Sequence, residues 1–149
     1  MAEKRYSILI ADESSGARDA LRGTLEPEGY EVVSATSGRE AIHIIRSELV
    51  HLVVMDVRLP DYSGFETYHA IKDIRDLFLP CIFTALEMTA DSIQDALSEE
   101  AVTILPKPVD TPRLVHAVDW SIGRYYAPGV DRRRPRDAGR FDWKVTSNQ

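Results

Sequence analysis

Several short apolar stretches of this chain end in side chains that could take part in chemistry. Consecutive apolar residues, such as 53–55 directly before Asp56, are typical of strands that are buried on both faces. In an open sheet of parallel strands, ligands bind just beyond the carboxyl ends of the strands. The candidate side chains at these ends are, in chain order, Asp12 and Glu13, Asp56, Thr84, and Lys107.

Three carboxylates, a hydroxyl and an ammonium group at one sheet edge would suit the transfer of a phosphoryl group. Clustered carboxylates repel one another unless a cation lies among them, and carboxylate oxygens with waters are the usual ligands of Mg²⁺. Lys107 and Thr84 could neutralise and hydrogen-bond an incoming phosphoryl group. Asp56 would then be the nucleophile and would form an acyl phosphate.

The elements that must position these side chains alternate regularly along the chain. Five strand–helix repeats, at spacings of roughly 20 to 25 residues, predict a parallel sheet with right-handed crossovers. We expect an α/β fold: a flavodoxin-like, doubly wound, five-stranded sheet of order 2-1-3-4-5. Helices one and five should cover one face and helices two, three and four the other. The strands are predicted at 6–11, 30–35, 52–55, 80–85 and 102–105.

The predicted helices follow each strand and begin at polar capping residues. They cover 17–25, the segment after the turn at 36–38, 65–75, the segment from 89 or 91 to 100, and the segment from 111 to about 125. The second helix should turn Ala41, Ile42, Ile45 and Leu49 inward. Ser14 or Ser15, and Thr36 or Ser37, are candidate caps of the first two helices. Thr111 is predicted to cap the last helix, with Pro112 at its first position.

Length and composition agree with one globular domain. The chain has 149 residues, of which 44% are hydrophobic and 28% charged. A single cysteine, Cys81, excludes an internal disulfide and fits a reducing compartment. No apolar run approaches the ~20 residues of a membrane span, and the N-terminal run is too short for a signal peptide. The four histidines show no metal-ligand spacing. We therefore expect a cytoplasmic protein without a membrane segment.

The charge is unevenly distributed along the chain. From Pro128 onward, six basic and three acidic residues give a net charge of +3. Because the net charge of the whole chain is −6, the residues before Pro128 carry −9. An acidic body argues against nucleic-acid binding by the domain itself. Residues 127–149 are predicted to be a basic, disordered C-terminal tail.

Taken together, the candidate residues and their neighbours resemble the receiver domain of bacterial two-component response regulators. The resemblance covers about residues 4–126, and the order and spacing of the motifs agree throughout. The motifs are Asp12-Glu13, Asp56 followed by Leu59-Pro60 and Gly64, Thr84-Ala85, and Lys107-Pro108.

The resemblance implies a phosphorylation-dependent signalling switch. Asp56 would accept a phosphoryl group from the phosphohistidine of a sensor histidine kinase or phosphotransfer protein. Lys107 would contact that group, and Thr84 would move to hydrogen-bond it. The bond between Lys107 and Pro108 is usually cis in this family. The implied Mg²⁺ ligands are Asp12, Glu13, Asp56 and the backbone carbonyl of Arg58.

The resemblance also implies that the protein acts through its partners. Phosphorylation would bias the surface of helix four, strand five and helix five, which binds a downstream protein or a second copy. The only catalysis expected is the chain's own phosphoryl acceptance and slow loss. Because no output domain is recognisable after residue 126, we expect a stand-alone regulator or a fragment of a longer protein.

Some positions depart from the family pattern and support an alternative. Glu13 stands where the second acidic residue is usually Asp, and Ile104 stands where an aromatic switch residue is usual. These departures motivate a pseudo-receiver, a binding or dimerisation module that does not depend on phosphorylation. Leu86 and Pro106 also depart from the pattern. A haloacid-dehalogenase-like phosphatase would need a second Asp at the position of Arg58, so we set that class aside.

Overall fold

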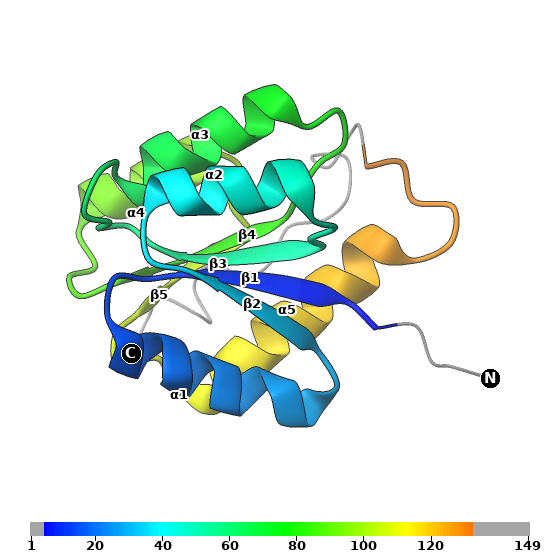
Figure 1. Cartoon of the computed structure of the whole chain (residues 1–149), viewed down its shortest axis with the longest axis horizontal. Coiled ribbons are helices and arrows are strands. Elements are labelled where there is room, and N and C mark those ends of the chain that lie inside the picture. Colours follow the sequence, from blue (N-terminus) through cyan, green and yellow to red (C-terminus); the bar gives the residue numbers. More distant parts are fainter. Residues whose placement is uncertain (1–4, 133–149) are drawn as a thin grey trace.

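The computed structural model describes residues 5–132, and these form a three-layered α/β fold (Figure 1). A five-stranded sheet of order β2-β1-β3-β4-β5 lies in the middle, and every described pair of neighbouring strands is parallel. The predicted strand order is therefore confirmed. The strands are β1 (Ser7–Ala11), β2 (Glu31–Ala35), β3 (Leu52–Asp56), β4 (Cys81–Ala85) and β5 (Thr103–Pro106).

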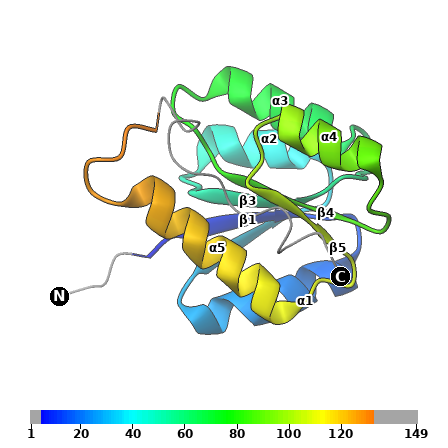
Figure 2. The ribbon, with the colours of Figure 1, turned by 180° about the vertical axis from the view of Figure 1, so that it is seen from behind.

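The helices cover both faces of the sheet as predicted. In Figures 1 and 2, α1 and α5 lie on one face, and α2, α3 and α4 lie on the other. Their bounds lie within a few residues of the predicted ones. The helices are α1 (Ser15–Leu25), α2 (Gly38–Ser47), α3 (Gly64–Ile74), α4 (Ala90–Ser98) and α5 (Thr111–Tyr126), with a short 3₁₀ helix η1 (Glu26–Glu28) after α1.

Each face of the sheet has its own hydrophobic core. All five residues of β3 are buried, as are all five of β4, which agrees with unbroken apolar runs at the centre of a parallel sheet. Leu9, Val53 and Phe83 pack under α2, α3 and α4, whereas Ile10, Val54 and Ile82 pack under α1 and α5. Alternate residues of the same strands therefore anchor the two helical layers.

Side-chain caps begin the helices, and one predicted cap was wrong. Ser14 and Ser37 cap α1 and α2, accepting hydrogen bonds from Ala17 N and Glu40 N. The cap of α5 is Asp110, not Thr111; its carboxylate accepts from Arg113 N at 3.1 Å. A carboxylate caps at least as well as the hydroxyl of Thr, and starting one residue earlier puts Pro112 at the second helical position.

The end of α2 differs from the prediction. Ala41 and Ile45 are buried as expected, but the helix ends at Ser47, and Glu48 adopts an extended conformation. Leu49 therefore leaves the inner face of the helix, and 70% of its surface is exposed. Because the chain must turn here to enter β3, the helical spacing that placed Leu49 inward no longer applies.

The predicted C-terminal tail is described only as far as Arg132. Val130 N donates to Ala127 O at 3.2 Å, and Phe78 N donates to Arg132 O at 3.0 Å. The first residues after α5 therefore fold back toward the loop before β4. Residues 133–149, on which the prediction of a disordered tail mainly rests, lie outside the described residues.

Candidate functional site

Four of the sequence-predicted positions meet at the carboxyl edge of the sheet. Asp12 directly follows β1, Asp56 is the last residue of β3, and Lys107 directly follows β5. Thr84, in β4, pairs in register with Asp56 across the β3–β4 ladder and is fully buried. The strand order places β3 between β1 and β4, so Asp56 lies at the middle of this edge.

Lys107 joins the two buried carboxylates. Its Nζ atom lies 2.9 Å from Oδ2 of Asp12 and 2.7 Å from Oδ2 of Asp56. The side chains of Asp12 and Asp56 are only 3% and 12% exposed. Burial alone would lower the pKa of Lys107, but hydrogen bonds from Nζ to Asp56 and Asp12 outweigh it, so the pKa lies above its ordinary value. The ammonium group is therefore the charge that lets two carboxylates share this site.

The remaining carboxylate oxygens are held by backbone groups. Ser14 N donates to Oδ1 of Asp12 at 2.9 Å, and Arg58 N donates to Oδ1 of Asp56 at 3.0 Å. Each carboxylate thus has one oxygen fixed by an N–H two residues ahead and the other fixed by Lys107. Such a carboxylate is oriented before any ligand arrives, which is what a nucleophile needs.

Glu13 does not join the cluster. Its side chain is exposed, while its carbonyl oxygen accepts from Nη1 of Arg18 at 3.0 Å. Across residues 5–132, no group of three or more His, Cys, Asp or Glu side chains lies close enough together to hold a metal ion. The two carboxylates that do converge are hard oxygen donors, and a Mg²⁺ site needs only one or two carboxylates beside carbonyls and waters. This donor set fits the predicted ion.

Gly64 lets the loop after Asp56 close tightly. Gly64 N donates to Val57 O at 2.8 Å. A Cβ atom at Gly64 would lie 2.3 Å from the carbonyl oxygen of Asp56, which is a backbone atom and cannot move aside. The glycine in the sequence motif is therefore required by a close approach to the backbone of the central aspartate.

Asp61 in the same loop is a residue that the sequence analysis missed. Its Oδ1 accepts from Gly38 N at 2.8 Å, and its Oδ2 accepts from Arg39 N at 2.9 Å. Burial alone would raise the pKa of Asp61, but backbone hydrogen bonds from Arg39, Tyr62 and Gly38 together outweigh it and hold the pKa below its ordinary value. The loop that follows Asp56 is thereby tied to the N-terminus of α2. The sequence alone gives little indication of this role, because the two backbone N–H groups that Asp61 binds lie 22 and 23 residues earlier in the chain.

An apolar groove leads to the site between α1 and the start of α5. It encloses about 400 Å³, and Thr84 and Lys107 lie along it with Ala17, Ala20 and Leu114. Leu86, 73% exposed, forms part of its wall. Ala20 is exposed and lines this groove, whereas Leu21 and Leu25 of the same helix are buried.

The structure also gives the surroundings or conformation of several other residues named in the sequence analysis. Ile104, three residues before Lys107, is fully buried under the α2–α3–α4 layer. The bond between Lys107 and Pro108 is cis. Cys81 and His51 are packing residues, since both are buried.

Comparison with known proteins agrees with the resemblance that the sequence motifs indicate. The family model described as "Response regulator receiver domain" matches residues 8–119. The chain is 30% identical over 121 residues to the polar-differentiation response regulator DivK of Brucella ovis, covering 78% of this chain and 96% of DivK. It is also 31% identical over 133 residues to the transcriptional regulatory protein GlrR of Escherichia coli K12, covering 89% of this chain. The chain spans only 30% of the length of GlrR.

Solved structures show the same fold. A CheY-like response regulator receiver domain protein from Methanospirillum hungatei superposes with a TM-score of 0.75 at 26% identity, covering 80% of this chain and 94% of that one. A two-component response regulator from Clostridium difficile gives a TM-score of 0.76 at 26% identity, covering 80% and 98%.

The match to the family model spans most of the described residues and includes every converging side chain of the site. Among residues 5–132, no helix is long and apolar enough to cross a membrane. The strand order, the Asp12–Lys107–Asp56 cluster and the sequence similarity agree with one another. The chain belongs to the response regulator receiver domain family.

Proposed function

We propose that Asp56 accepts a phosphoryl group from the phosphohistidine of a sensor histidine kinase or of a phosphotransfer protein. Receiver domains of response regulators serve phosphorylation-dependent signalling. One observation carries it: the carboxylate of Asp56 is held at the open edge of the sheet, 2.7 Å from the ammonium of Lys107. A carboxylate in this position is oriented for attack and has a cation beside it.

The reaction moves a phosphoryl group from nitrogen to oxygen. A carboxylate oxygen of Asp56 attacks phosphorus, the bond from phosphorus to the imidazole nitrogen breaks, and the imidazole leaves and takes up a proton. Lys107 shifts from its bond with the Asp56 oxygen to neutralise charge on the transferred group. Thr84, on the strand beside Asp56, supplies a hydroxyl to that group. The only other reaction expected is the slow hydrolysis of the acyl phosphate, in which water takes the phosphoryl group as phosphate and the Asp56 carboxylate is released.

The residues proposed to hold Mg²⁺ are Asp12, Glu13, Asp56 and the carbonyl of Arg58. When bound, the ion supplies positive charge to the oxygens of the transferred group. Asp12 and Asp56 are already buried together, and Arg58 N already contacts Asp56. Glu13 is the exposed member of the set and has one more methylene than an aspartate at this position.

Phosphorylation is proposed to act through the surface formed by α4, β5 and α5. Thr84 is separated by a few residues from α4, and Lys107 from α5, so a change at either side chain reaches this surface through short connections. That surface would bind a downstream protein or a second phosphorylated copy. We place this signalling in the cytoplasm, where a free Cys81 stays reduced.

A second candidate function is a pseudo-receiver that binds partners without being phosphorylated. Two observations favour it. Ile104 is fully buried and has no ring to change position with Thr84, and Glu13 lies outside the carboxylate cluster. In that case the site would be a structural ion-pair cluster.

Titration with beryllofluoride in the presence of Mg²⁺ separates these functions, because it mimics the phosphoryl group on the acceptor. We expect saturable changes in the ¹⁵N–¹H spectrum of the wild type, centred on Asp56 and Lys107 and extending to α4 and β5. Asp56→Asn should abolish them. Asp73→Asn is the matched control, since it makes the same replacement at an exposed position near the end of α3, away from the carboxyl edge of the sheet. A wild type that does not respond would establish the pseudo-receiver instead.

A further inference from the structure

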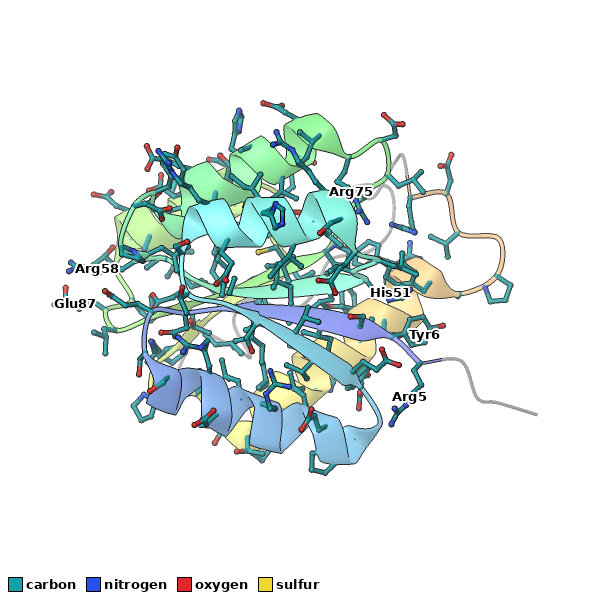
Figure 3. The ribbon with its side chains drawn as sticks, in the orientation of Figure 1. Arg5, Tyr6, His51, Arg58, Arg75 and Glu87 are labelled. Carbon is teal, nitrogen blue, oxygen red and sulfur yellow. The ribbon has the colours of Figure 1, made fainter. Side chains whose placement is uncertain are left out.

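A second hollow lies at the amino-terminal edge of the sheet, opposite the site of Asp56. It encloses about 500 Å³, and its walls come from the segment before β3, the end of α3 and the residues after α5. Figure 3 shows Arg75, His51 and Tyr6 gathered at this end, whereas Arg58 and Glu87 lie at the other. The proposed phosphorylation chemistry does not use this hollow.

Several exposed apolar side chains lie around the hollow. In the described part of the chain, five large hydrophobic side chains are exposed, and three of them line this one hollow. They are Leu49, Leu77 and Ile74, with exposures of 70%, 45% and 38%. Scattered exposed apolar residues are ordinary, but a group of them around one hollow marks an interaction surface. Leu49 is the residue that the sequence pattern had placed in the core.

Hydrogen bonds and a stacked ring hold the two arginines of the hollow in place. The guanidinium of Arg132 stacks on the ring of Tyr126 at 4.4 Å, and its Nε donates to Phe78 O at 3.1 Å. Tyr126 donates in turn to the carbonyl of His51 at 2.5 Å. Arg75 donates to Ile45 O and Val50 O at 3.4 and 3.3 Å. The surface is therefore held in place before a partner arrives, which lowers the entropic cost of association.

The rim carries both signs of charge. Arg75 and Arg132 line the hollow together with Asp76, which is exposed and makes no ion pair with the rest of residues 5–132. We call Leu49, Ile74, Arg75, Asp76, Leu77 and Arg132 the amino-edge patch. It combines apolar contact area with two arginines and one acidic group. The same patch on a second copy therefore offers apolar side chains to its apolar side chains and a charge of opposite sign to its charged groups.

We propose that the amino-edge patch is the contact between two copies of this chain, related by a two-fold axis. Apolar side chains of one patch meet those of the other, and Asp76 of each copy meets the arginines of its partner. A small molecule fits the patch less well, because a ligand inside the hollow would leave the protruding Leu49 in water. An unrelated partner would need to present apolar, cationic and acidic groups together, and a second copy of the patch already carries all three.

This association would be independent of phosphorylation. The patch lies at the edge of the sheet opposite Asp56, and both the groove between α1 and α5 and the surface of α4 and β5 stay free. The proposal therefore differs from phosphorylation-dependent pairing through α4, β5 and α5. It also stands apart from the proposed function, because a pseudo-receiver could form the same dimer.

The test is the mass of the full chain in solution, measured by sedimentation equilibrium over a range of concentrations. We expect a concentration-dependent rise to about twice the 16.8 kDa of one chain, both in the wild type and in Asp56→Asn. Leu49→Glu combined with Leu77→Glu should weaken association about tenfold or more. Both side chains are exposed, so the fold should persist, and circular dichroism checks this. Asp76→Arg should also weaken it, because each patch would then carry cations only.

Leu86→Glu is the matched control. Leu86 is as exposed as Leu49 but lies at the opposite edge of the sheet, so its replacement should leave association unchanged. A chain that remains monomeric at all concentrations would overturn the proposal, and so would equal effects of the Leu86 and Leu49 variants. Cross-links from the patch to residues 133–149 of the same chain would overturn it in favour of an internal occupant.

Discussion

At the scale of single residues, Lys107 has two partners that lie 51 and 95 positions away in the chain. The carboxylates of Asp12 and Asp56 share this one ammonium group, and each has one further hydrogen bond from a backbone N–H. Without the ammonium, two nearly buried negative charges would face each other. The stability of this edge of the sheet therefore depends on Lys107 as much as the proposed chemistry does.

Replacing Lys107 by Met should destabilise the protein at pH 7 by about 1–3 kcal/mol, because a buried ionic partner is removed. Two nearly buried carboxylates would then face each other without a cation. Urea unfolding at pH 7 measures the loss. Lys107→Arg retains a cation and should lose less, and equal losses for the Met and Arg variants would contradict the electrostatic explanation.

Tyr126 gives a prediction at alkaline pH. Burial raises its pKa to about 12, although Arg132 and Arg75 act in the opposite direction. In the unfolded chain a tyrosine ionises near pH 10. The stability that comes from the neutral phenol is therefore complete below about pH 10 and is lost as pH rises toward 12. Urea midpoints of the wild type should fall across this window.

Tyr126→Phe is the control for this effect. It removes the hydrogen bond to the carbonyl of His51, so it should be less stable at pH 8 by about 1 kcal/mol. Its midpoint should then fall less steeply between pH 10 and 12, because no phenol at this position can ionise. Parallel curves for the two proteins would show that Tyr126 does not titrate as described.

At the scale of elements, the packing of the N-terminus of α3 against the end of β3 determines the shape of the site. Gly64 begins α3, and its Cα lies against the carbonyl of Asp56. The loop between them is tied to α2 through Asp61. The start of α3 thus meets the end of β3 at the backbone of the proposed acceptor, and α2 is joined to the loop that follows it.

Gly64→Ala should cost about 1–3 kcal/mol, since the added methyl group would overlap backbone atoms that cannot rotate away. It should also shift the amide signals of Asp56 and Val57. Gly23→Ala in α1 is the matched control, because a Cβ added there would have nothing within 4 Å. There Ala loses less conformational entropy than Gly on folding, so the replacement should stabilise the helix by up to about 1 kcal/mol. Urea unfolding of both variants checks the contrast; equal effects would mean that the close contact at Gly64 relaxes without cost.

At the scale of the whole molecule, a sheet with helices on both faces places the two edges of its strands in separate environments. The carboxyl edge holds the cluster of Asp12, Asp56 and Lys107, and the amino edge holds the amino-edge patch. The strands between them are fully buried at the centre of the sheet. The proposed phosphoryl transfer and the proposed association therefore use separate edges of the sheet.

Cys81 tests the integrity of this central layer. The thiol begins β4 and is completely buried, and burial raises its pKa well above the ordinary value. It should therefore react with a disulfide reagent only when the whole sheet opens, since the thiolate is the reactive form. The labelling rate should rise with urea in step with global unfolding measured by circular dichroism. Fast labelling in native buffer would show that β4 opens locally.

Much of this architecture follows from the sequence alone. Unbroken apolar runs identified the buried strands, and their regular alternation with helices predicted a parallel sheet with right-handed crossovers. The strand order 2-1-3-4-5 was the flavodoxin-like order of a doubly wound sheet. Because the chain passes through each strand in the same direction, the residues after the strands had to meet at one edge. Asp12, Asp56, Thr84 and Lys107 could therefore be named in advance, and the family with them.

Only the tertiary structure decided how the side chains at that edge pair. Lys107 reaches both carboxylates, Glu13 turns to the surface, and Asp61 caps a helix that lies before it in the chain. Leu49 leaves the core because α2 ends two residues earlier than its apolar spacing predicted. Apolar periodicity specifies which face of an element is buried, but the end of a helix and the partner of a charge depend on distances between residues far apart in the sequence. Those distances exist only once the layers have packed.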